Sequence, residues 1–369
     1  MVSYFVFLTI STGIFAIFAL GLNIQWGYTG LINFGHVAFM TVGAYTTILL
    51  SMQGVPLILA TIAGSVLAML LGLLVGISTL RLREDYLAIV TIGVSELLRL
   101  VALNEEWLTR GAYGVQRYPL PLGEFNPNWL SKGTMIFILS AIALFAVWQL
   151  RQGLQSEFEQ RKQQRGITRF PLDLGFWGVL ALLLGGVVYV NGVIALVDYS
   201  YKSGLMLLIL IVLTVFYAIV ESLARSPWGR VLKAIREDEQ VPRALGKDVF
   251  WYKLQAFMLG GAIAGIAGAF YAWQLTTIYP SNFQPLISFY AWTIVVLGGA
   301  GNNAGVMLGA VIFWTYDSLT RFVLPQLNWI DDARLGAFRI LVIGLILMIL
   351  MVSRPQGILG KKEELTLGR

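Results

Sequence analysis

Polar side chains and glycines gather in an otherwise apolar stretch near the start of the chain, residues 22–45. Its amides, hydroxyls and single imidazole can hydrogen-bond a small solute, and its glycines permit positive φ and close helix approach. With His36 neutral the stretch carries no formal charge, so it suits a net-neutral solute better than an ion. The candidate residues for lining a path are Asn23, Gly27, Gly30, Asn33, Gly35, His36, Phe39, Gly43 and Tyr45.

A second glycine-rich break, residues 297–305, interrupts an apolar run near the other end of the chain. Unwound backbone of this kind can present amide donors and carbonyl acceptors to a small zwitterion or to urea. It is not a phosphate loop, because G-x-x-x-x-G-K-[ST] occurs nowhere in the sequence and ATP binding is therefore not expected. The two asparagines either touch solute or only cap half-helices. The candidates here are Gly298, Gly299, Gly301, Asn302 and Asn303.

Composition excludes several kinds of chemistry. The chain has no cysteine and one histidine, which rules out thiolate catalysis, disulfides and multi-histidine metal sites. His36 has a second interpretation as a buried imidazole that holds two helices together, and the glycines around it as packing contacts. We predict no catalytic residue, no metal and no cofactor.

Composition also predicts the elements that position these residues. The chain of 369 residues is 57% hydrophobic and 12% charged, with a mean hydropathy of +0.74, whereas soluble domains are about 25% charged. We predict an all-α polytopic membrane protein, one transmembrane domain over 1–369, with about 10–11 transmembrane or re-entrant helices. The second, fourth, ninth and tenth are expected to be re-entrant or discontinuous, because they contain glycines and polar residues. The expected spans lie near 4–24, 31–50, 55–79, 86–103, 134–150, 172–190, 200–223, 254–274, 288–299, 303–320 and 337–353.

Basic residues set the expected orientation. Residues 80–85, 151–171, 224–253 and the C-terminal tail hold 18 of the 26 Lys and Arg, so the positive-inside rule places them in the cytoplasm. The net charge of +6 therefore calls for no nucleic acid. The insertion 151–171 is polar with a helical composition, and we assign it no chemistry.

Two charges lie inside the expected span 86–103. Glu96 and Arg99 are three residues apart, so they can pair on one face of a helix. Charges inside a span are functional candidates, but a structural pair near the end of the span is the alternative.

The longest charged interval between apolar runs, residues 226–246, cannot lie in lipid. Residues 229–239 have the apolar spacing of an amphipathic helix. Pro242 is expected to interrupt this helix and begin another, and Gly246 to supply a left-handed stop. A charged elbow between two spans suits contact with a soluble partner, and a solvated basic loop is the alternative.

These stretches resemble LivM-type permeases of ABC importers. Residues 234–239, 244–246 and 249–257 are similar to that family's cytoplasmic coupling loop, with Val241-Pro242 where small residues are usual. The pattern G-x-x-G-x-x-x-x-G-H-x-x-F-x-x-x-G-A-Y, which begins at Gly27, is similar to the family's hallmark. The resemblance implies ATPase contact for Ala234, Ile235, Arg236, Glu237, Asp238, Glu239, Ala244, Leu245 and Gly246.

The resemblance also implies a function. It implies a non-enzymatic permease subunit in the bacterial inner membrane that passes neutral or branched-chain amino acids. The implied partners are a second permease subunit, two ABC ATPase subunits, an external substrate-binding protein and membrane lipid. The stretch after Gly35 is closer to cyanobacterial-type neutral amino acid permeases than to urea permeases, and urea is the alternative substrate. The other alternative is an ion-coupled secondary carrier or an intramembrane enzyme. A carrier needs carboxylates at mid-membrane and a hydrolase needs paired His, Ser, Asp or Glu on facing spans, whereas most acidic residues here lie in predicted loops.

Overall fold

The computed structural model describes residues 2–81, 84–165 and 172–323 and, beyond them, 336–338, 341–342, 344–345, 348–349, 352 and 356–360. This part of the chain is almost wholly helical, which confirms the predicted class. Six of its helices are long and apolar enough to cross a membrane, and one bent helix pair makes a possible seventh. The helix Val37–Met52 and the apolar segment Leu182–Val197 of a longer helix are shorter. The chain is therefore a multi-pass membrane protein.

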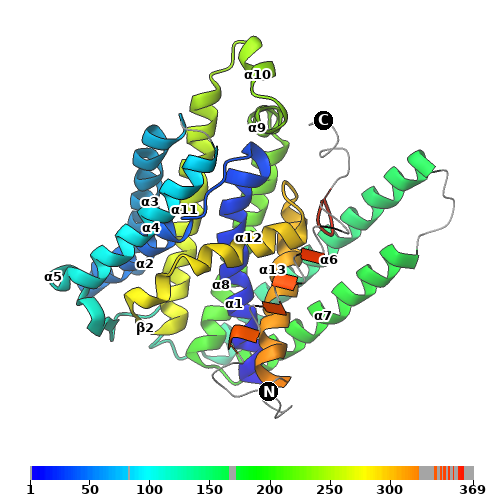
Figure 1. Cartoon of the computed structure of the whole chain (residues 1–369). Helices are drawn as coiled ribbons and strands as arrows, with labels where there is room; N and C mark the ends of the chain where they lie inside the picture. Colours follow the sequence, from blue (N-terminus) through cyan, green and yellow to red (C-terminus); the bar gives the residue numbers. More distant parts are fainter. Residues whose placement is uncertain are drawn as a thin grey trace. The chain divides into compact units, whose positions relative to one another are not determined.

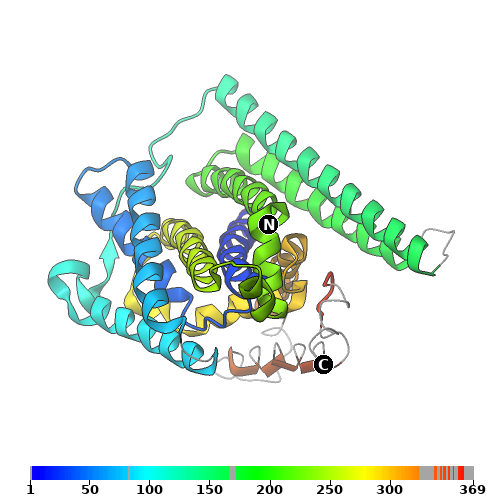
Figure 2. The ribbon, with the colours of Figure 1, turned by 90° about the horizontal axis from the view of Figure 1, so that it is seen from above.

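The chain divides into two compact units. The first comprises the residues up to Ile10 and Leu122–Thr214. Its elements are the start of α1 (Val2–Leu22), α6 (Trp129–Arg165), α7 (Leu172–Val197) and most of α8 (Tyr201–Arg225). Figures 1 and 2 show α6 and α7 lying side by side as a hairpin, and buried Leu139, Leu196 and Leu207 form the core of this unit. Helix α6 continues to Arg165 through the predicted polar insertion, whose residues 166–171 lie outside the described part.

The second unit comprises Ser11–Pro121 and Val215–Arg369. Its centre is a trio of helices, α2 (Val37–Met52), α3 (Leu57–Thr79) and α11 (Val249–Leu275). Glycines bring their backbones together, because a Cβ on Gly43 would lie 2.1 Å from the Gly265 carbonyl oxygen. Another on Gly21 of α1 would lie 2.6 Å from the Gly260 oxygen of α11, and Figure 2 shows these two helices as neighbours.

Short elements join the longer helices of the second unit. They are α5 (Glu106–Thr109), the 3₁₀ turns Gly111–Tyr113 and Pro280–Phe283, and the antiparallel strands β1 (Val115–Gln116) and β2 (Thr277–Ile278), paired Val115 to Ile278. The Tyr118 hydroxyl donates to the Ala272 carbonyl at 2.5 Å, and burial raises the pKa of this phenol above its ordinary value. Tyr118 therefore stays a neutral donor that ties the loop to α11.

The structure tests the predicted helix breaks. The second span is broken, since α2 begins only at Val37 after an irregular stretch. The ninth and tenth are α12 (Leu286–Gly298) and α13 (Asn303–Val323), which meet at a bend of 118°. The prediction for the fourth span is wrong, because α4 (Glu84–Asn104) is one continuous helix. Gly93 lies within this helix, and a Cβ added there would meet nothing within 4 Å. Of the expected span 337–353, residues 339–340, 343, 346–347, 350–351 and 353 lie outside the described residues.

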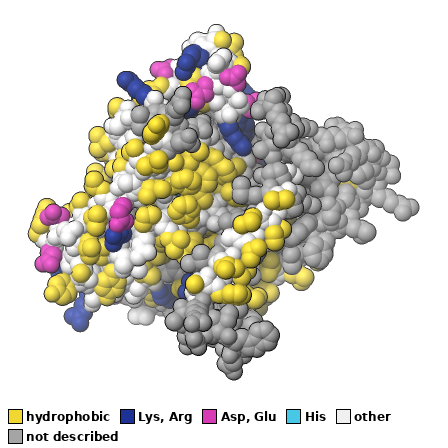
Figure 3. Space-filling model, viewed as in Figure 1, with side chains coloured by type: hydrophobic (Ala, Val, Ile, Leu, Met, Phe, Trp, Pro, Cys, Tyr) yellow, Lys and Arg dark blue, Asp and Glu magenta, His cyan; other side chains and the backbone are white. Residues whose placement is uncertain are grey.

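Charged side chains mark two regions of the second unit. Figure 3 shows them around α9 (Pro227–Glu237) and α10 (Gln240–Ala244) and again near α5, with hydrophobic side chains between the two regions. Helices α3 and α4 carry exposed apolar residues such as Ile58, Leu74 and Ile89. This is the side-chain distribution of a membrane-embedded surface.

Candidate functional site

Helix α1 ends in a π-helical turn, η1 (Asn23–Gly27), from which the hallmark stretch continues. Gly30, with φ +78°, ends the helical stretch, and its amide donates to the Trp26 carbonyl at 2.9 Å. The Leu31 amide donates to the Gln25 carbonyl at 3.0 Å. These bonds make a glycine C-cap, which requires the left-handed conformation at residue 30. Irregular backbone therefore lies in the interior of the unit. Single π turns in helices are frequent at functional sites.

The two glycine-broken stretches meet at Asn23, which is fully buried. Its Nδ2 donates to Asn303 Oδ1 at 3.0 Å, and its Oδ1 accepts from the Gly301 amide at 2.9 Å. A Cβ on Gly27 would lie 2.6 Å from the Gly301 nitrogen, so glycine at position 27 permits this approach. Four of the predicted path residues, drawn from opposite ends of the sequence, therefore form one cluster.

A carboxylate that the sequence analysis did not select also reaches this cluster. Asn303 Nδ2 donates to Glu221 Oε2 of α8 at 2.9 Å, and Glu221 pairs with Arg225 at 2.7 Å. The cluster is thus not built from uncharged groups alone, although the pair adds no net charge. The available sequence signal was an acid four residues before an arginine at the end of an apolar span.

Gln25, which was likewise not selected, organises the turn after η1. Its Nε2 donates to the Phe257 carbonyl at 2.9 Å, and its Oε1 accepts from Asn33 Nδ2 at 2.8 Å. The Trp292 indole donates to the Asn33 carbonyl at 2.9 Å. Asn33 Oδ1 is buried and has no hydrogen bond in the described structure. Gln25 therefore connects α1, α11 and the irregular stretch, and Asn33 keeps one acceptor unused.

His36 lies between α1 and the start of α2 and is fully buried. Its Nε2 is 3.1 Å from the Phe18 carbonyl, which requires the proton on Nε2, and its ring packs on Phe18 with centroids 4.6 Å apart. Nδ1 is buried without a hydrogen-bond partner among the described residues. These contacts match the interpretation of His36 as an imidazole that holds two helices together.

The remaining residues of the first predicted set make packing contacts. A Cβ on Gly35 would lie 1.8 Å from the Thr91 oxygen of α4, so this glycine permits close backbone contact. Phe39 packs edge-on against Phe257, and Gly43 contacts α11 as described above. Tyr45 packs against Phe283, with its hydroxyl buried and without a hydrogen bond in the described part.

The second break is closed by its own glycines and by a C-terminal segment. A Cβ on Gly298 would lie 2.0 Å from the Gly305 oxygen, and Gly299 has φ +112°. Asn302 Oδ1 accepts from the Gly305 amide at 3.1 Å, and its Nδ2 donates to the Leu359 carbonyl at 2.8 Å. Asn302 therefore acts as a helix cap in this structure, whereas Asn303 joins the cluster.

The predicted amphipathic helix is α9, whose Leu232 and Ile235 are buried. Ser226 caps it by accepting from the Gly229 amide at 3.4 Å, with Pro227 in the first turn. The prediction that it runs to residue 239 and breaks at Pro242 is wrong. The helix ends at Glu237 because Asp238 is extended and its carboxylate accepts from the Gln240 amide at 2.8 Å.

Two features of the elbow are confirmed. Pro242 lies in the first turn of α10, and Gly246 has φ +73°. Figure 1 shows α10 at the tip of this unit, beyond the end of α11. Val241 and Leu245 at this tip are 53% and 74% exposed, which leaves an apolar surface among charges.

The residues predicted to contact an ATPase divide between surface and interior. The exposed ones are Glu237, Asp238, Ala244, Leu245 and Gly246. Ile235 is buried, and Glu239 forms an ion pair with Lys253. Arg236 reaches inward, where its Nη1 donates to the Gly27 carbonyl at 2.6 Å. Ala234 is half-buried. Thus α9, through Arg236, connects the exposed part of the elbow directly to η1.

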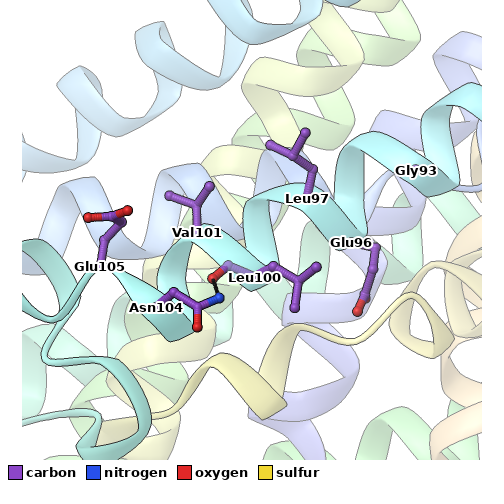
Figure 4. Close-up of a pocket in the computed structure, with 7 residues that line it drawn as sticks. All are labelled: Gly93, Glu96, Leu97, Leu100, Val101, Asn104 and Glu105. Carbon is purple, nitrogen blue, oxygen red and sulfur yellow. Dashed lines mark hydrogen bonds between the residues drawn. The ribbon is translucent and has the colours of Figure 1, made fainter.

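The intramembrane charge pair is confirmed on α4, where Arg99 Nε donates to Glu96 Oε2 at 2.9 Å. Figure 4 shows the Glu96 and Leu100 side chains on one side of α4 and that of Leu97 on the other, and all three line a hollow of about 450 Å³. The Glu96 side chain is 38% exposed. This pair makes no described contact with the cluster around Asn23.

Residues 4–351 match the family model described as "Branched-chain amino acid transport system / permease component". The chain is 30% identical to the high-affinity branched-chain amino acid transport system permease protein LivM of Salmonella typhimurium, over 94% of this chain and 68% of the relative. It is 23% identical to the probable LivM of Methanocaldococcus jannaschii, over 96% and 92% of the two chains. Similarity extends to LivH of Salmonella typhimurium, at 23% over 95% and 92%. No solved structure matches.

Proposed function

Because the chain belongs to the family of branched-chain amino acid transport permeases, we propose that it is a permease subunit of an ABC importer for neutral or branched-chain amino acids. It lies in the bacterial inner membrane and is not itself an enzyme. Two partner ATPase subunits hydrolyse ATP, and an external binding protein delivers the amino acid. The relatives named LivM and LivH support a second permease subunit of similar sequence.

The observation that carries this proposal is the meeting of the two broken stretches at Asn23 and Asn303. Interrupted helices from opposite ends of a chain commonly surround the substrate path of a transporter. The cluster presents amides and glycine backbone among apolar helices, and its one carboxylate, Glu221, is paired with Arg225. Groups of this kind suit a zwitterion without net charge, whereas a cationic or dicarboxylic amino acid calls for additional charged partners.

The elbow supports the proposed contact with an ATPase. Exposed Val241 and Leu245 form an apolar tip that charged residues surround. Buried apolar anchors within a charged rim are typical of protein interfaces. The tip is joined to η1 through Arg236. We assign ATPase contact to the exposed members of the predicted set, from Glu237 to Gly246, and mechanical transmission to those that face inward.

The alternatives are distinguished by transport. An ion-coupled carrier requires a carboxylate that is free to bind the coupling ion, whereas both oxygens of Glu221 already accept hydrogen bonds, one from Asn303 and one from Arg225. Urea, like a zwitterionic amino acid, carries no net charge and forms hydrogen bonds. Both solutes therefore suit the cluster, and transport distinguishes them.

The test is reconstitution of the complete assembly in liposomes with labelled leucine, lysine, glutamate and urea. We expect leucine uptake that requires both ATP and the binding protein. Dominant urea uptake would select the alternative substrate. Uptake driven by an ion gradient without ATP would contradict the importer assignment, and dominant lysine or glutamate uptake would contradict the argument from net charge.

A further inference from the structure

We propose that Glu221 at the end of α8 and Arg236 of α9 are positioning residues. Together they form a two-point clamp that holds the elbow, residues 226–246, to the two broken stretches. The clamp rests on the proposed function and specifies how movement of the elbow reaches the path. One point holds η1 and the other holds the start of α13. The two held segments are bonded to each other, so they move together.

The first point is Arg236. The Gly27 carbonyl belongs to the last turn of a helix, where carbonyls lose their intrahelical partners. The guanidinium of Arg236 donates to it at 2.6 Å, and arginine provides a donor that stays charged at every physiological pH. Lys233, one turn earlier, lies 5.5 Å from the centre of the Tyr28 ring. Helix α9 therefore contacts this turn at two successive residues, Gly27 and Tyr28.

The second point is Glu221, on the last turns of α8 just before the elbow. Its carboxylate accepts from Asn303 at 2.9 Å, while its other oxygen accepts from Arg225 at 2.7 Å. Its side chain is 24% exposed, so the bond to Asn303 is partly shielded from water. Bonds with an ionised partner are stronger than neutral ones, and this one fixes the amide orientation of Asn303.

The two points close a ring. From Glu221 the bonds run to Asn303, then to Asn23 and, through the Gly27 backbone, to Arg236. The first turn of α9 is held as well, because the Trp228 indole donates to Gln255 of α11 at 2.8 Å. A displacement of α9 that keeps these bonds must therefore displace η1 and the second break together. Coupling between distant sites needs a contiguous element of this kind or a shared equilibrium.

A purely structural role is the competing explanation for Arg236, since it caps a free carbonyl. That role predicts a less stable chain but no change in the amino acid transported per ATP hydrolysed. The clamp predicts a change in this ratio. The matched control is Arg230 on the same helix, which is exposed and donates a long hydrogen bond of 3.4 Å to the Arg225 carbonyl.

The first experiment measures leucine transported per ATP hydrolysed in the reconstituted assembly. We expect Arg236→Gln and Glu221→Gln each to lower this ratio about tenfold, within the usual range of allosteric coupling. Arg236→Lys, which keeps a charged donor, should restore part of it, and Arg230→Gln should match the wild type. The double variant should be little worse than either single one, because both changes open the same ring.

The second experiment uses the absence of cysteine from the chain. Tyr28→Cys and Lys233→Cys together create the only thiol pair, which a cleavable bifunctional reagent can join. The clamp keeps η1 and α9 together during transport, so joining them should leave uptake equal to that of the unjoined variant. If joining blocks uptake and cleavage restores it, α9 slides past η1 and the clamp is wrong.

The proposal is also overturned if Arg236→Gln and Glu221→Gln retain the wild-type ratio. It is equally overturned if Arg230→Gln lowers the ratio as much as they do. Failure of the proposed function gives a different result, namely no ATP-driven uptake by the wild-type assembly. In that case a thermal double-mutant cycle on Arg236 and Glu221 in the purified chain still tests the ring, since additive effects on the unfolding midpoint would exclude it.

Discussion

Asn23 and Asn303 lie 280 residues apart in the sequence, yet their side-chain amides are hydrogen-bonded at 3.0 Å. Both orientations are fixed by further bonds. Asn23 Oδ1 accepts from the Gly301 amide, so its nitrogen faces Asn303, and the Asn303 nitrogen faces the Glu221 carboxylate. Each donor in the cluster thus meets an acceptor, and a change that inverts one of them leaves two acceptors face to face.

Asn303→Asp makes that inversion without a change in size. It places a second carboxylate against Glu221 in a partly buried position, which replaces a hydrogen bond by like-charge contact. We expect a loss of about 1–3 kcal/mol in the free energy of unfolding, measured as a lower thermal midpoint of the purified chain in detergent, together with reduced leucine uptake.

The control for this change is the combination of Asn303→Asp with Glu221→Gln, which restores a donor facing an acceptor. We expect the double variant to recover most of the midpoint. An Asn303→Asp chain with the thermal midpoint of the wild type would show that the bond to Glu221 contributes little to stability. A double variant with a midpoint no higher than that of the single variant would show the same.

Gly35 and Gly93 provide a matched pair for testing close packing between α4 and the turn that precedes α2. A Cβ on Gly35 would lie 1.8 Å from a backbone oxygen of Thr91, whereas a Cβ on Gly93 would meet nothing within 4 Å. Gly35→Ala should therefore cost about 1–3 kcal/mol or more through overpacking. Gly93→Ala, inside a helix, should gain about 0.5–1 kcal/mol. The measurement is again the thermal midpoint, and equal midpoints for the two variants would contradict the packing described here.

Much of the fold follows from properties of single segments. Apolar length predicted α1, α3 and α11, and glycine and amide content predicted the breaks before α2 and between α12 and α13. The left-handed residue at Gly246 was predicted because glycine alone adopts that conformation without cost. Gly93 shows the limit of this reasoning, because α4 continues through it without a break. A glycine interrupts a helix only where a packed neighbour or a cap stabilises the interruption.

The partners within the site could not be predicted in the same way. Glu221 contacts Asn303, and Gln25 contacts the Phe257 carbonyl, across 82 and 232 residues of sequence. Hydrophobic period and local spacing describe what a segment is, not which distant segment it meets. The break at Asp238 was missed for a local reason, since the bond from its carboxylate to the Gln240 amide competes with the helix.

Gly246→Val tests the left-handed stop after α10. The backbone there has φ +73° and an added side chain meets nothing within 4 Å, so only backbone strain acts. A β-branched residue in this conformation costs about 1–2 kcal/mol or more. We expect the elbow to change shape, with weaker copurification of the ATPase subunits and lower uptake, while amino acid binding by the external protein is unchanged.

Gly246→Asn is the control for that substitution, because asparagine adopts the left-handed conformation at little cost. It should copurify with the ATPases almost as the wild type does. A Gly246→Val assembly that forms and transports at the wild-type rate would remove the elbow tip from the proposed ATPase contact.

The pair Glu96–Arg99 gives the last prediction. Its bond of 2.9 Å lies within α4, on a helix whose Leu97 and Leu100 are exposed. Glu96→Gln leaves an unpaired guanidinium in an apolar span, for which insertion scales give a cost of about 2.5–3.5 kcal/mol at the centre of a helix. The combination Glu96→Gln with Arg99→Gln removes both charges, and replacing a whole ion pair is often neutral or stabilising. We therefore expect the single variant to reduce the amount of folded protein in membranes, measured by size-exclusion chromatography of a fluorescent fusion, and the double variant to restore it. If the double variant folds well but abolishes uptake, the pair serves transport as well as stability. If it folds as poorly as the single variant, neutralisation is not what the pair provides, and the structural interpretation is wrong.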